Sequence, residues 1–584
     1  MILDFNLHEY RQQMLAKKVF DTSRRHIDKP ELPQTDNNQT TAPSGKPRDI
    51  MSGLAPYTGD WKPTQVVHLL KRTMFGASSQ HLNELLKLSP QEAVDTLLNL
   101  PSVNPPINNY NGLPINDEGT EFLADPYVTL GETWIDAPYT DDPYVVYGRY
   151  VSLKGWWIRQ MRYQSLSIAE KMVLFWHNHF ATQASEIFEP RATWRYLNTL
   201  RQHALGNFKK LTKAITLDPQ MLFYLNGAQN IAGSPDENYA RELQELFCVG
   251  KGPNSKYTEN DVQNAARVLT GFTVTDFDLL TTTFIAFNHD KKDKTFSAFY
   301  KNTSIKGKLG NDGQYELDDL LDMIFDTDEA ALFICRKLYR FFVYHEITPQ
   351  TETDVIEPLA QILRDNDYEI APVLSALFAS EHFFDPLNFA AVIKSPIDFC
   401  IGLLREYEVA LPDTTKYSAD WTLGELINFV LALLMQEPGD PPNVAGWPAY
   451  YQEPQFDKYW INTNSFPRRI QVCDALIYTG INYYEEEKIQ IDIVGITKQL
   501  SNPGDPNALI DETLMRMYIY NLTDEGKAQL KNILLSGQSN DYYWTTAWNY
   551  YIDNPTNSDA YLLIYYRLAE MYRRIMQLEE YQLM

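Results

Sequence analysis

Cysteine is scarce in this sequence, and its spacing limits what the thiols can do. The 584 residues include 4 cysteines, and no two of them form a CxxC pair. Because structural zinc sites take their ligands in closely spaced pairs, such a site is excluded. Each cysteine stands among apolar neighbours, as in LFCVG and LFICRKL, which favours buried free thiols. The cysteines are Cys248, Cys335, Cys400 and Cys473.

Positive charge is also in short supply. Lysine and arginine number 51 against 76 aspartates and glutamates, which gives a formal net charge of −25 and a pI near 4.8. A general nucleic-acid binder presents a basic face, and docking to an anionic membrane needs basic clusters. The charge balance therefore argues against both of these classes of protein.

Long apolar runs are missing as well. No run approaches the roughly 18–20 residues that cross a bilayer. The N-terminal stretch MILDFNLHEYRQQMLAKKVF has no apolar segment of the kind found in signal peptides. We therefore expect no membrane span, and a soluble protein that is cytoplasmic by default. Export or attachment to the cell surface is the alternative.

What the sequence does have is helical patterning. With 44% hydrophobic and 13% aromatic residues it is globular in composition. We expect a mainly α fold, a large multi-helix globular body with a small β-hairpin insertion near residues 272–308, where Thr, Phe and Ile alternate. The expected divisions are an N-terminal helix (1–20), a Pro-rich polar linker or surface strap (21–63), a helical core domain (64–475) and a tyrosine-rich helical region (476–584).

Helix boundaries follow from the spacing of apolar residues and from capping signals. SPQEAVDTLLNL begins with a capping box that has proline at the first helical position. Later helices are predicted at 316–326, 328–345, 353–366, 370–380, 389–408 and 421–436, and the last hundred residues again have helical patterning.

The stretch FWHNHF places two of the ten histidines, His177 and His179, in an apolar run. Ser167 and Glu170 form an apparent capping box, so the spacing predicts a helix from about 168 to 180. At about 100° per residue the two histidines point to nearly opposite faces, so they cannot both bind one metal while the helix persists. We expect His177 to face inward toward the acidic helix described next, and His179 to contact the following loop.

A second polar cluster lies in SPDENYARELQELF, residues 234–247. Ser234, Pro235 and Glu237 suggest another capping box. Four polar residues then share one helical stripe: Asn238, Arg241, Glu242 and Glu245. Two interpretations stay open. The stripe is a solvated face with an Arg241–Glu245 ion pair, or it lines a pocket and supplies a general base, a metal ligand and an anion clamp.

Two further segments are candidates. In FNHDKKDKT, the residues His289, Asp290 and Lys294 stand at the mouth of the expected hairpin, where they either bind a cation or orient an acid–base group, or form an ordinary turn. NVAGWP and WINTNSFPRR place Trp447 and Trp460 in turn-rich backbone, which is typical of binding surfaces and of segments that cover a core. Whether any of these residues binds a metal is left open.

Familiar catalytic motifs are absent. The chain has no GxSxG, no Walker A loop and no GxGxxG after a predicted strand. VYHEITP is not a zincin motif, because proline occupies position 349 where the second histidine is required. HNH nucleases take their histidines from separated parts of a ββα unit, so the His-Asn-His sequence does not indicate that class.

An ordered series of motifs nevertheless resembles one known family. HLLKRTMFGAS, EKMVLFWHNHFAT, DENYARELQELFCVG, YTENDVQNAARVLTGF, FNHDKKDKT, ICRKLYRFFV, KSPIDFCIGLLRE and PPNVAGWP occur in this order. Together they are similar to the bacterial domain of unknown function 1800 family over roughly residues 64–475. The activity of that family is not established. Family members commonly have a histidine where this chain has Phe247, which weakens the case for a metal site here.

The resemblance also implies a partner. Many members are encoded beside a second uncharacterised family that resembles alkaline phosphatases and sulfatases, and those neighbours often carry export signals. Two functions therefore compete. The first is a binding or assembly protein with a buried polar centre. The alternative is a metal-assisted hydrolase that uses the region of His177, Glu242 and His289. Convergence of these residues in an open cleft would favour the enzyme, and closed networks would favour the binding protein.

Overall fold

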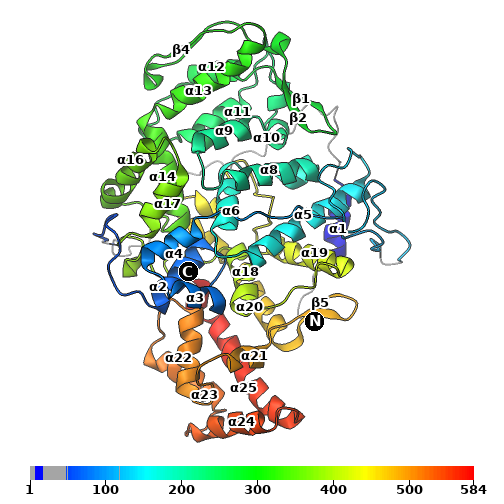
Figure 1. The fold of residues 1–584 in the computed structure, drawn as a ribbon, viewed down its shortest axis with the longest axis vertical. Coiled ribbons are helices and arrows are strands. Elements are labelled where there is room, and N and C mark those ends of the chain that lie inside the picture. Colours follow the sequence, from blue (N-terminus) through cyan, green and yellow to red (C-terminus); the bar gives the residue numbers. More distant parts are fainter. Residues whose placement is uncertain (1–6, 18–47, 49, 117–118) are drawn as a thin grey trace.

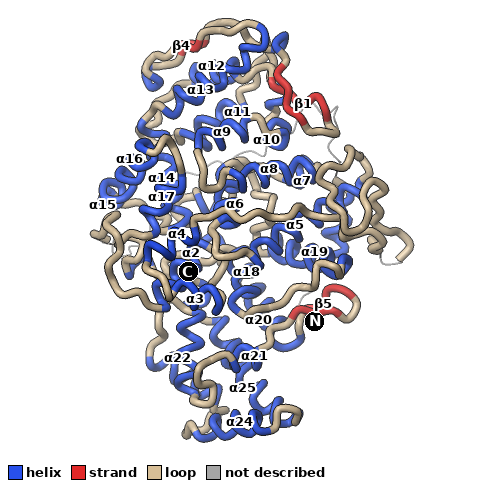
Figure 2. The backbone as a smooth tube through the Cα atoms, in the orientation of Figure 1, coloured by secondary structure: helices blue, strands red, loops and turns tan. Residues whose placement is uncertain are grey.

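The computed structural model describes residues 7–17, 48, 50–116 and 119–584. Helices make up most of this part of the chain, and the described strands form three two-stranded antiparallel sheets (Figures 1 and 2). The mainly α prediction is confirmed. Of the expected helix 1–20, the structure describes α1 (Leu7–Leu15), and most of the expected linker 21–63 lies outside the described residues.

The elements run through the molecule in three groups, from blue and cyan to green to red in Figure 1. The first group is α2 (Pro63–Thr73), α3 (Ser79–Leu85), α4 (Pro90–Leu97), α5 (Pro143–Tyr163), α6 (Ala169–His179), α7 (Ala184–Ile187), α8 (Pro190–Gln202), α9 (Phe208–Thr216) and α10 (Pro219–Tyr224). The second is α11 (Asn238–Glu242), α12 (Glu259–Val268), α13 (Glu316–Phe325), α14 (Asp328–Phe342), α15 (Pro349–Thr351), α16 (Glu357–Asp365), α17 (Ile370–Phe378), α18 (Pro396–Glu406) and α19 (Tyr417–Leu433). The third is α20 (Ser465–Asp474), α21 (Ile493–Lys498), α22 (Pro506–Met517), α23 (Asp524–Leu534), α24 (Tyr542–Asp553) and α25 (Ser558–Gln577).

Many of these helices start by the same chemistry, a capping side chain followed by proline. The predicted box at α4 is confirmed, since Ser89 Oγ accepts the Glu92 N–H and the Glu92 side chain accepts the Ser89 N–H. Proline has no N–H to leave unpaired at this position, and its fixed φ suits the first helical turn. The same rule corrects the helix expected at 389–408. Ser395 and Pro396 start α18, so the residues before them remain non-helical.

The predicted β insertion is also confirmed. Strands β1 (Phe272–Asp276) and β2 (Thr281–Phe284) pair antiparallel, as do β3 (Lys294–Thr295) and β4 (Ser304–Ile305). A further hairpin, β5 (Ile481–Tyr484) with β6 (Glu487–Ile489), lies in the C-terminal region that was expected to be helical. Gly480 precedes it with a φ of 72°, which favours glycine, and the turn follows Tyr484. Apolar and polar residues alternate in INYY and EKI, a pattern that indicates strands and that the helix prediction did not include.

One hydrophobic core joins the described residues, from Met14 in α1 to Tyr581. It contains residues on both sides of position 475, the expected boundary of the C-terminal region. Helices α5 and α19 pack closely, and a Cβ added to Gly155 would lie 3.2 Å from the Cα of Gly424. Two glycines therefore allow these helices to touch through their backbones. The four cysteines are free and buried, as expected.

Among the described residues, no helix has the length and apolar character required to span a bilayer.

Candidate functional site

Helix α6 carries the two histidines, but it does not start as predicted. Its N-cap is Ile168, and the side chain of Glu170 does not return to cap the helix. Instead Glu170 forms an ion pair with Arg201, with 2.7 Å between Nη2 and Oε2, and accepts a hydrogen bond of 2.9 Å from Trp157 Nε1. The capping-box prediction is wrong here because Glu170 neutralises a buried arginine.

The structure places the two histidines differently from the prediction. His177 is buried among the rings of Trp157, Tyr196 and Trp447, with centroids 5.7–5.9 Å away. His179 is the residue that meets the acidic segment, since its Nε2 lies 2.9 Å from the Phe247 carbonyl oxygen. The backbone N–H of Trp447 donates to Oδ1 of Asn178, the residue between the two histidines, so the HNH and GWP sequences interlock.

Acid should destabilise the protein through His177. Burial lowers the pKa of His177 from 6.5 to about 4, with Lys154 acting in the same direction and Asp440 opposing it. As pH falls below 6.5 the unfolded chain therefore takes up a proton that the folded chain does not, and stability decreases until about pH 4.

We expect urea unfolding to show a loss of about 2 kcal/mol from this residue between pH 7 and pH 5. A His177→Gln variant, compared with the wild type at both pH values, should lose less on acidification by about that amount. Equal losses in the two proteins would contradict the assignment.

The acidic segment is a short α-helix, α11, that continues as a π-helix over Leu243–Cys248. The predicted cap at Ser234 is wrong, since Glu237 is the N-cap and Ser234 lies in a turn that bridges to Ile231. In the π-helix the repeat is wider than 3.6 residues, so the predicted stripe does not stay on one face. Glu242 and Glu245 are both buried.

The predicted Arg241–Glu245 ion pair is not the one that forms. Arg241 donates to Glu237 at 3.0 Å and to Glu259 at 2.8 Å, on the half-exposed side of α11. Glu245 pairs instead with Lys251. Arg241 thus has two carboxylate partners of its own, and four cavities in the described part of the chain are lined by other residues.

His289 belongs to a buried ionic cluster that the sequence did not predict. Glu316, the first residue of α13, accepts from Lys294 Nζ at 2.5 Å and lies 3.1 Å from His289 Nε2. All three side chains are fully enclosed. Burial favours protonated Glu316, yet the bonds from His289 and Lys294 hold the pKa of Glu316 below its ordinary value. Asp290 points elsewhere and pairs with Arg267 at 2.8 Å.

The candidate residues are therefore distributed over separate networks. His177 contacts aromatic rings, Arg241 and Glu245 have different partners, and His289 is held by Glu316 and by the Thr270 backbone carbonyl at 2.9 Å. Within the described ranges, no group of three or more His, Cys, Asp or Glu side chains could hold a metal ion.

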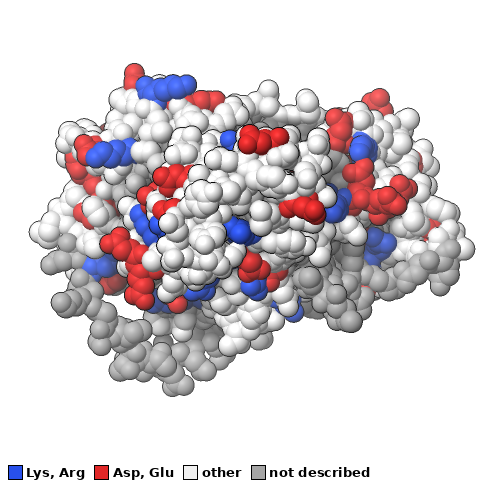
Figure 3. Space-filling model, turned by 90° about the horizontal axis from the view of Figure 1, so that it is seen from below, with Lys and Arg blue, Asp and Glu red and all other residues white. Residues whose placement is uncertain are grey.

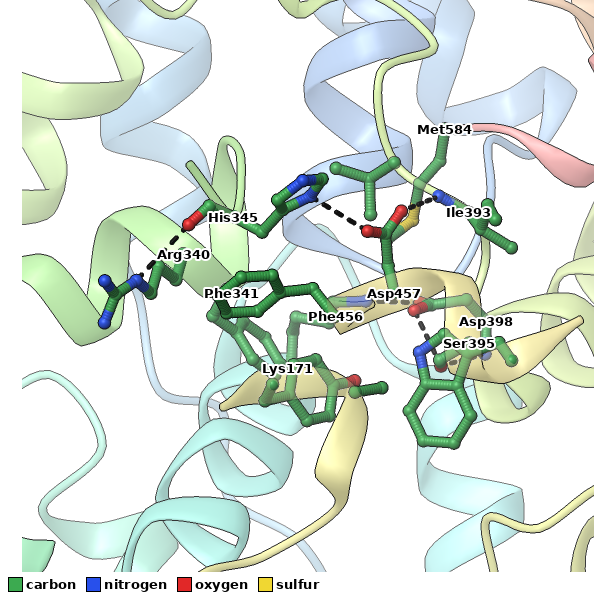
Figure 4. Close-up of a pocket in the computed structure, with 14 residues that line it drawn as sticks. Lys171, Arg340, Phe341, His345, Ile393, Ser395, Asp398, Phe456, Asp457 and Met584 are labelled. Carbon is green, nitrogen blue, oxygen red and sulfur yellow. Dashed lines mark hydrogen bonds and ion pairs between the residues drawn. The ribbon is translucent and has the colours of Figure 1, made fainter. Parts of the chain in front are cut away.

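Residues from several of the sequence motifs quoted above meet at one cavity, away from the candidate residues. A narrow cavity is lined by Lys171 of α6, Arg340 of α14, Asp398 of α18, and Ala449 just after the GWP sequence (Figure 4). Its free space of about 20 Å³ is enough for about one water molecule. Pockets that bind small molecules are typically 300–1,000 Å³. The cavity is thus too small for a substrate. We call it the motif junction, because its lining residues come from several of the sequence motifs.

One ion pair and one histidine–carboxylate contact organise this junction. Lys171 pairs with Asp398, whose other oxygen accepts a hydrogen bond of 2.9 Å from Ser395. His345 Nδ1 lies 2.9 Å from Asp457 Oδ1, and Asp457 also accepts the Ile393 N–H at 2.8 Å (Figure 4). The pKa of Lys171 is lowered by burial, and Asp398 opposes that shift. The junction therefore joins α6 to α18 by an ion pair, and it joins the 456–460 turn to His345 and to the backbone of Ile393.

A buried arginine lies close enough to the two carboxylates of the junction to be affected by their charges. Arg72 of α2, in the HLLKRTMFG motif, is enclosed, and its Nη2 donates to the Asn388 carbonyl at 3.0 Å. Burial lowers the pKa of Arg72 to about 9, while the charges of Asp457 and Asp398 oppose this. The two carboxylates of the junction thus stabilise a second buried cation as well as Lys171.

The chain matches one known family, whose description assigns no activity. The chain matches the family described as "Protein of unknown function (DUF1800)" over residues 68–583, which is nearly its whole length, and the protein belongs to that family. The match extends beyond residue 475 through the tyrosine-rich C-terminal region. No curated protein and no solved structure matches the chain.

Sequence reasoning missed the junction residues Lys171, Asp398, His345 and Asp457. One signal was available: a lysine in the apolar run EKMVLFW must have a buried partner, because a lone buried charge is very costly. The partner itself, Asp398, follows far along the chain and could not be chosen from the sequence. Trp447 and Trp460 are 1% and 3% exposed, so these two rings mainly cover the core.

Proposed function

We propose that the protein is a non-catalytic binding or assembly protein that docks a protein partner. The main support is an exposed tyrosine-rich surface on α24 and α25. Its large exposed side chains are Tyr542, Tyr543, Tyr550, Ile552, Tyr561, Leu562, Leu563 and Tyr566. Such dense exposure of apolar side chains is uncommon on monomers and is typical of interaction sites.

The position of this surface suits docking. Helices α24 and α25 form the lower tip of the molecule in Figure 1, and in Figure 3, which views the molecule from below, much of the surface carries no charged group. Tyr561 stacks on Tyr565 with 5.7 Å between ring centroids, so the rings are preordered. Tyrosine contributes large contact area at low entropic cost, and it is enriched among the residues that dominate binding energy.

The charge of the surface indicates the kind of partner. Asp553 and Asp559 are exposed beside the tyrosines, and the whole chain carries a net charge of −25. A second acidic copy would be repelled, whereas a partner surface with apolar and basic side chains is complementary. The partner that the family resemblance implies is the neighbouring alkaline phosphatase- or sulfatase-like protein.

The metal-assisted hydrolase built on His177, Glu242 and His289 has less support. His177 and His289 lie in separate networks, and both are fully enclosed. A general acid–base group must come within hydrogen-bond reach of a substrate. No observation specifically favours this second function.

The test is direct binding between the purified full chain and the purified protein of the neighbouring family, measured by biolayer interferometry. We expect a Tyr542→Ser/Tyr566→Ser variant to weaken binding at least tenfold, since buried tyrosines at interfaces often contribute 2 kcal/mol or more. The matched control is Tyr127→Ser/Tyr315→Ser, whose rings are 51% and 52% exposed elsewhere. Absence of binding, or equal weakening by both variants, would refute the proposal.

A further inference from the structure

A second cavity, distinct from the junction, opens beside the GWP sequence. Its volume is about 380 Å³, within the range of small-molecule pockets. Met435, Pro442 and Tyr459 form apolar walls, and Trp447 and Trp460 close the inner side. Trp460 and Ala449 line both this cavity and the narrow junction, so the two cavities are neighbours.

Two carboxylates, Glu437 and Asp440, stand in the wall of this cavity. One buried lysine, Lys154, pairs with both of them, through Glu437 Oε1 and through Asp440 Oδ2 at 2.6 Å. The set therefore has two acidic side chains for one basic side chain, an excess of one acidic group. The neighbouring His177 does not balance it, since its imidazole is neutral near pH 7.

The hydrogen bonds of Glu437 leave one of its oxygens available. Tyr10 Oη at 2.7 Å and Asn428 Nδ2 at 3.0 Å both donate to Oε1, the same atom that Lys154 contacts. Oε2 receives none of these bonds, and the Glu437 side chain is 19% exposed. Both oxygens of Asp440 accept hydrogen bonds, because Tyr150 Oη donates to Oδ2 and the Ser185 N–H donates to Oδ1.

We propose that this cavity binds an organic cation, an ammonium or guanidinium group on an apolar body, with the charge at Glu437 and the apolar part against Tyr459 and Met435. A carboxylate and an aromatic wall both favour a cation over a neutral group. An anion would be repelled by the two carboxylates. A hard metal ion needs six or more oxygen ligands, which these mainly apolar walls do not provide.

The same chemistry has two sources, a free amine or a basic side chain of a peptide. We would titrate the full chain by calorimetry with benzylamine and with the peptide acetyl-Leu-Arg-Leu-amide. The matched neutral probes are benzyl alcohol and the citrulline peptide, in which a urea replaces the guanidinium. We expect at least tenfold tighter binding of one or both cations than of their neutral counterparts.

Benzylamine binding alone would identify a free amine as the ligand, peptide binding alone would identify a side chain, and binding of both would assign the cation class. A neutral probe that binds as tightly as its cationic counterpart would overturn the proposal, as would no binding of either cation at millimolar concentration.

Two variants test the position of the charge. Met435→Lys adds a cation at an exposed wall residue and should reduce binding at least tenfold, whereas Met51→Lys, at a site 69% exposed elsewhere, should not change it. Glu437→Gln should also reduce binding, but this variant disturbs Lys154 as well. Unchanged binding in Met435→Lys would overturn the proposal whether or not the Glu437 variant folds.

Discussion

Replacing Glu316 by glutamine is expected to lower the free energy of unfolding by about 3–5 kcal/mol. The carboxylate accepts from Lys294 at 2.5 Å and from the Lys308 N–H at 2.6 Å, and it contacts His289. Glutamine can still accept the backbone N–H, but it leaves the enclosed ammonium of Lys294 without a counter-charge. Urea unfolding at pH 7 measures the loss.

Two comparisons separate the buried charge from a general effect of the substitution. The double variant Lys294→Met/Glu316→Gln removes the stranded cation and should recover at least half of the lost stability. Asp326→Asn removes the partner of Lys301 in an exposed pair and should change stability little. If Glu316→Gln behaves like Asp326→Asn, the buried cluster is not an important source of stability.

The contribution of Glu316 to the free energy of unfolding depends on pH. Because the pKa of Glu316 is lowered on folding, its contribution is present above the unfolded value of about 4.5. This contribution is lost as pH falls from there through the folded pKa.

Asp398→Asn is expected to have a comparable effect, again about 3–5 kcal/mol, at the motif junction. The substitution removes the counter-charge of Lys171, whose side chain is 2% exposed, and leaves a single amide oxygen where the carboxylate accepts from both Lys171 and the Ser395 hydroxyl at the start of α18. The enclosed ammonium then lies against the rings of Phe75 and Phe341, with centroids 4.9 Å and 5.7 Å away, and without its paired carboxylate.

The sign of the pH dependence distinguishes this mechanism. Burial already lowers the pKa of Lys171, and loss of Asp398 removes the main opposing charge. In the variant the unfolded chain therefore binds more protons than the folded chain, so the defect should shrink as pH rises toward 10. Urea unfolding at pH 7 and pH 9.5 measures this difference between wild type and variant. A defect of constant size would point to lost helix capping and not to a stranded charge.

How far the sequence predicted the structure depended on the range of the interactions involved. Local rules gave the mainly α class, the cap at Ser89 and the hairpins within 272–308, because period and turn chemistry act over a few residues. They failed at Glu170 and Ser234, where an apparent capping box was overridden. Glu170 neutralises Arg201, and the helix expected to start at Ser234 begins later and widens into a π-helix.

For the candidate site, the sequence indicated which residues are polar, but it did not predict which residues contact one another. The sequence indicated His289 and Asp290 as polar candidates beside the hairpin, and in the structure His289 contacts Glu316 whereas Asp290 pairs with Arg267. Such pairs bridge separate elements, and nothing local in the sequence specifies them. The positions of His177 and His179 were predicted as opposite faces, and only tertiary packing decided which face met the acidic segment.

The pairing of residues 582–584 with residues 392–394 has a consequence for synthesis on the ribosome. The Val392 N–H and the Met584 N–H donate to each other's carbonyl oxygens, and the Lys394 N–H donates to the Gln582 carbonyl. At about 5–20 residues per second, the intervening chain takes on the order of ten seconds or more to make. During that interval the nascent 392–395 segment and the cavity next to Asp398 lack their last covering residues. We expect the central body to stay open to chaperones or proteases until the C-terminal helices have been translated.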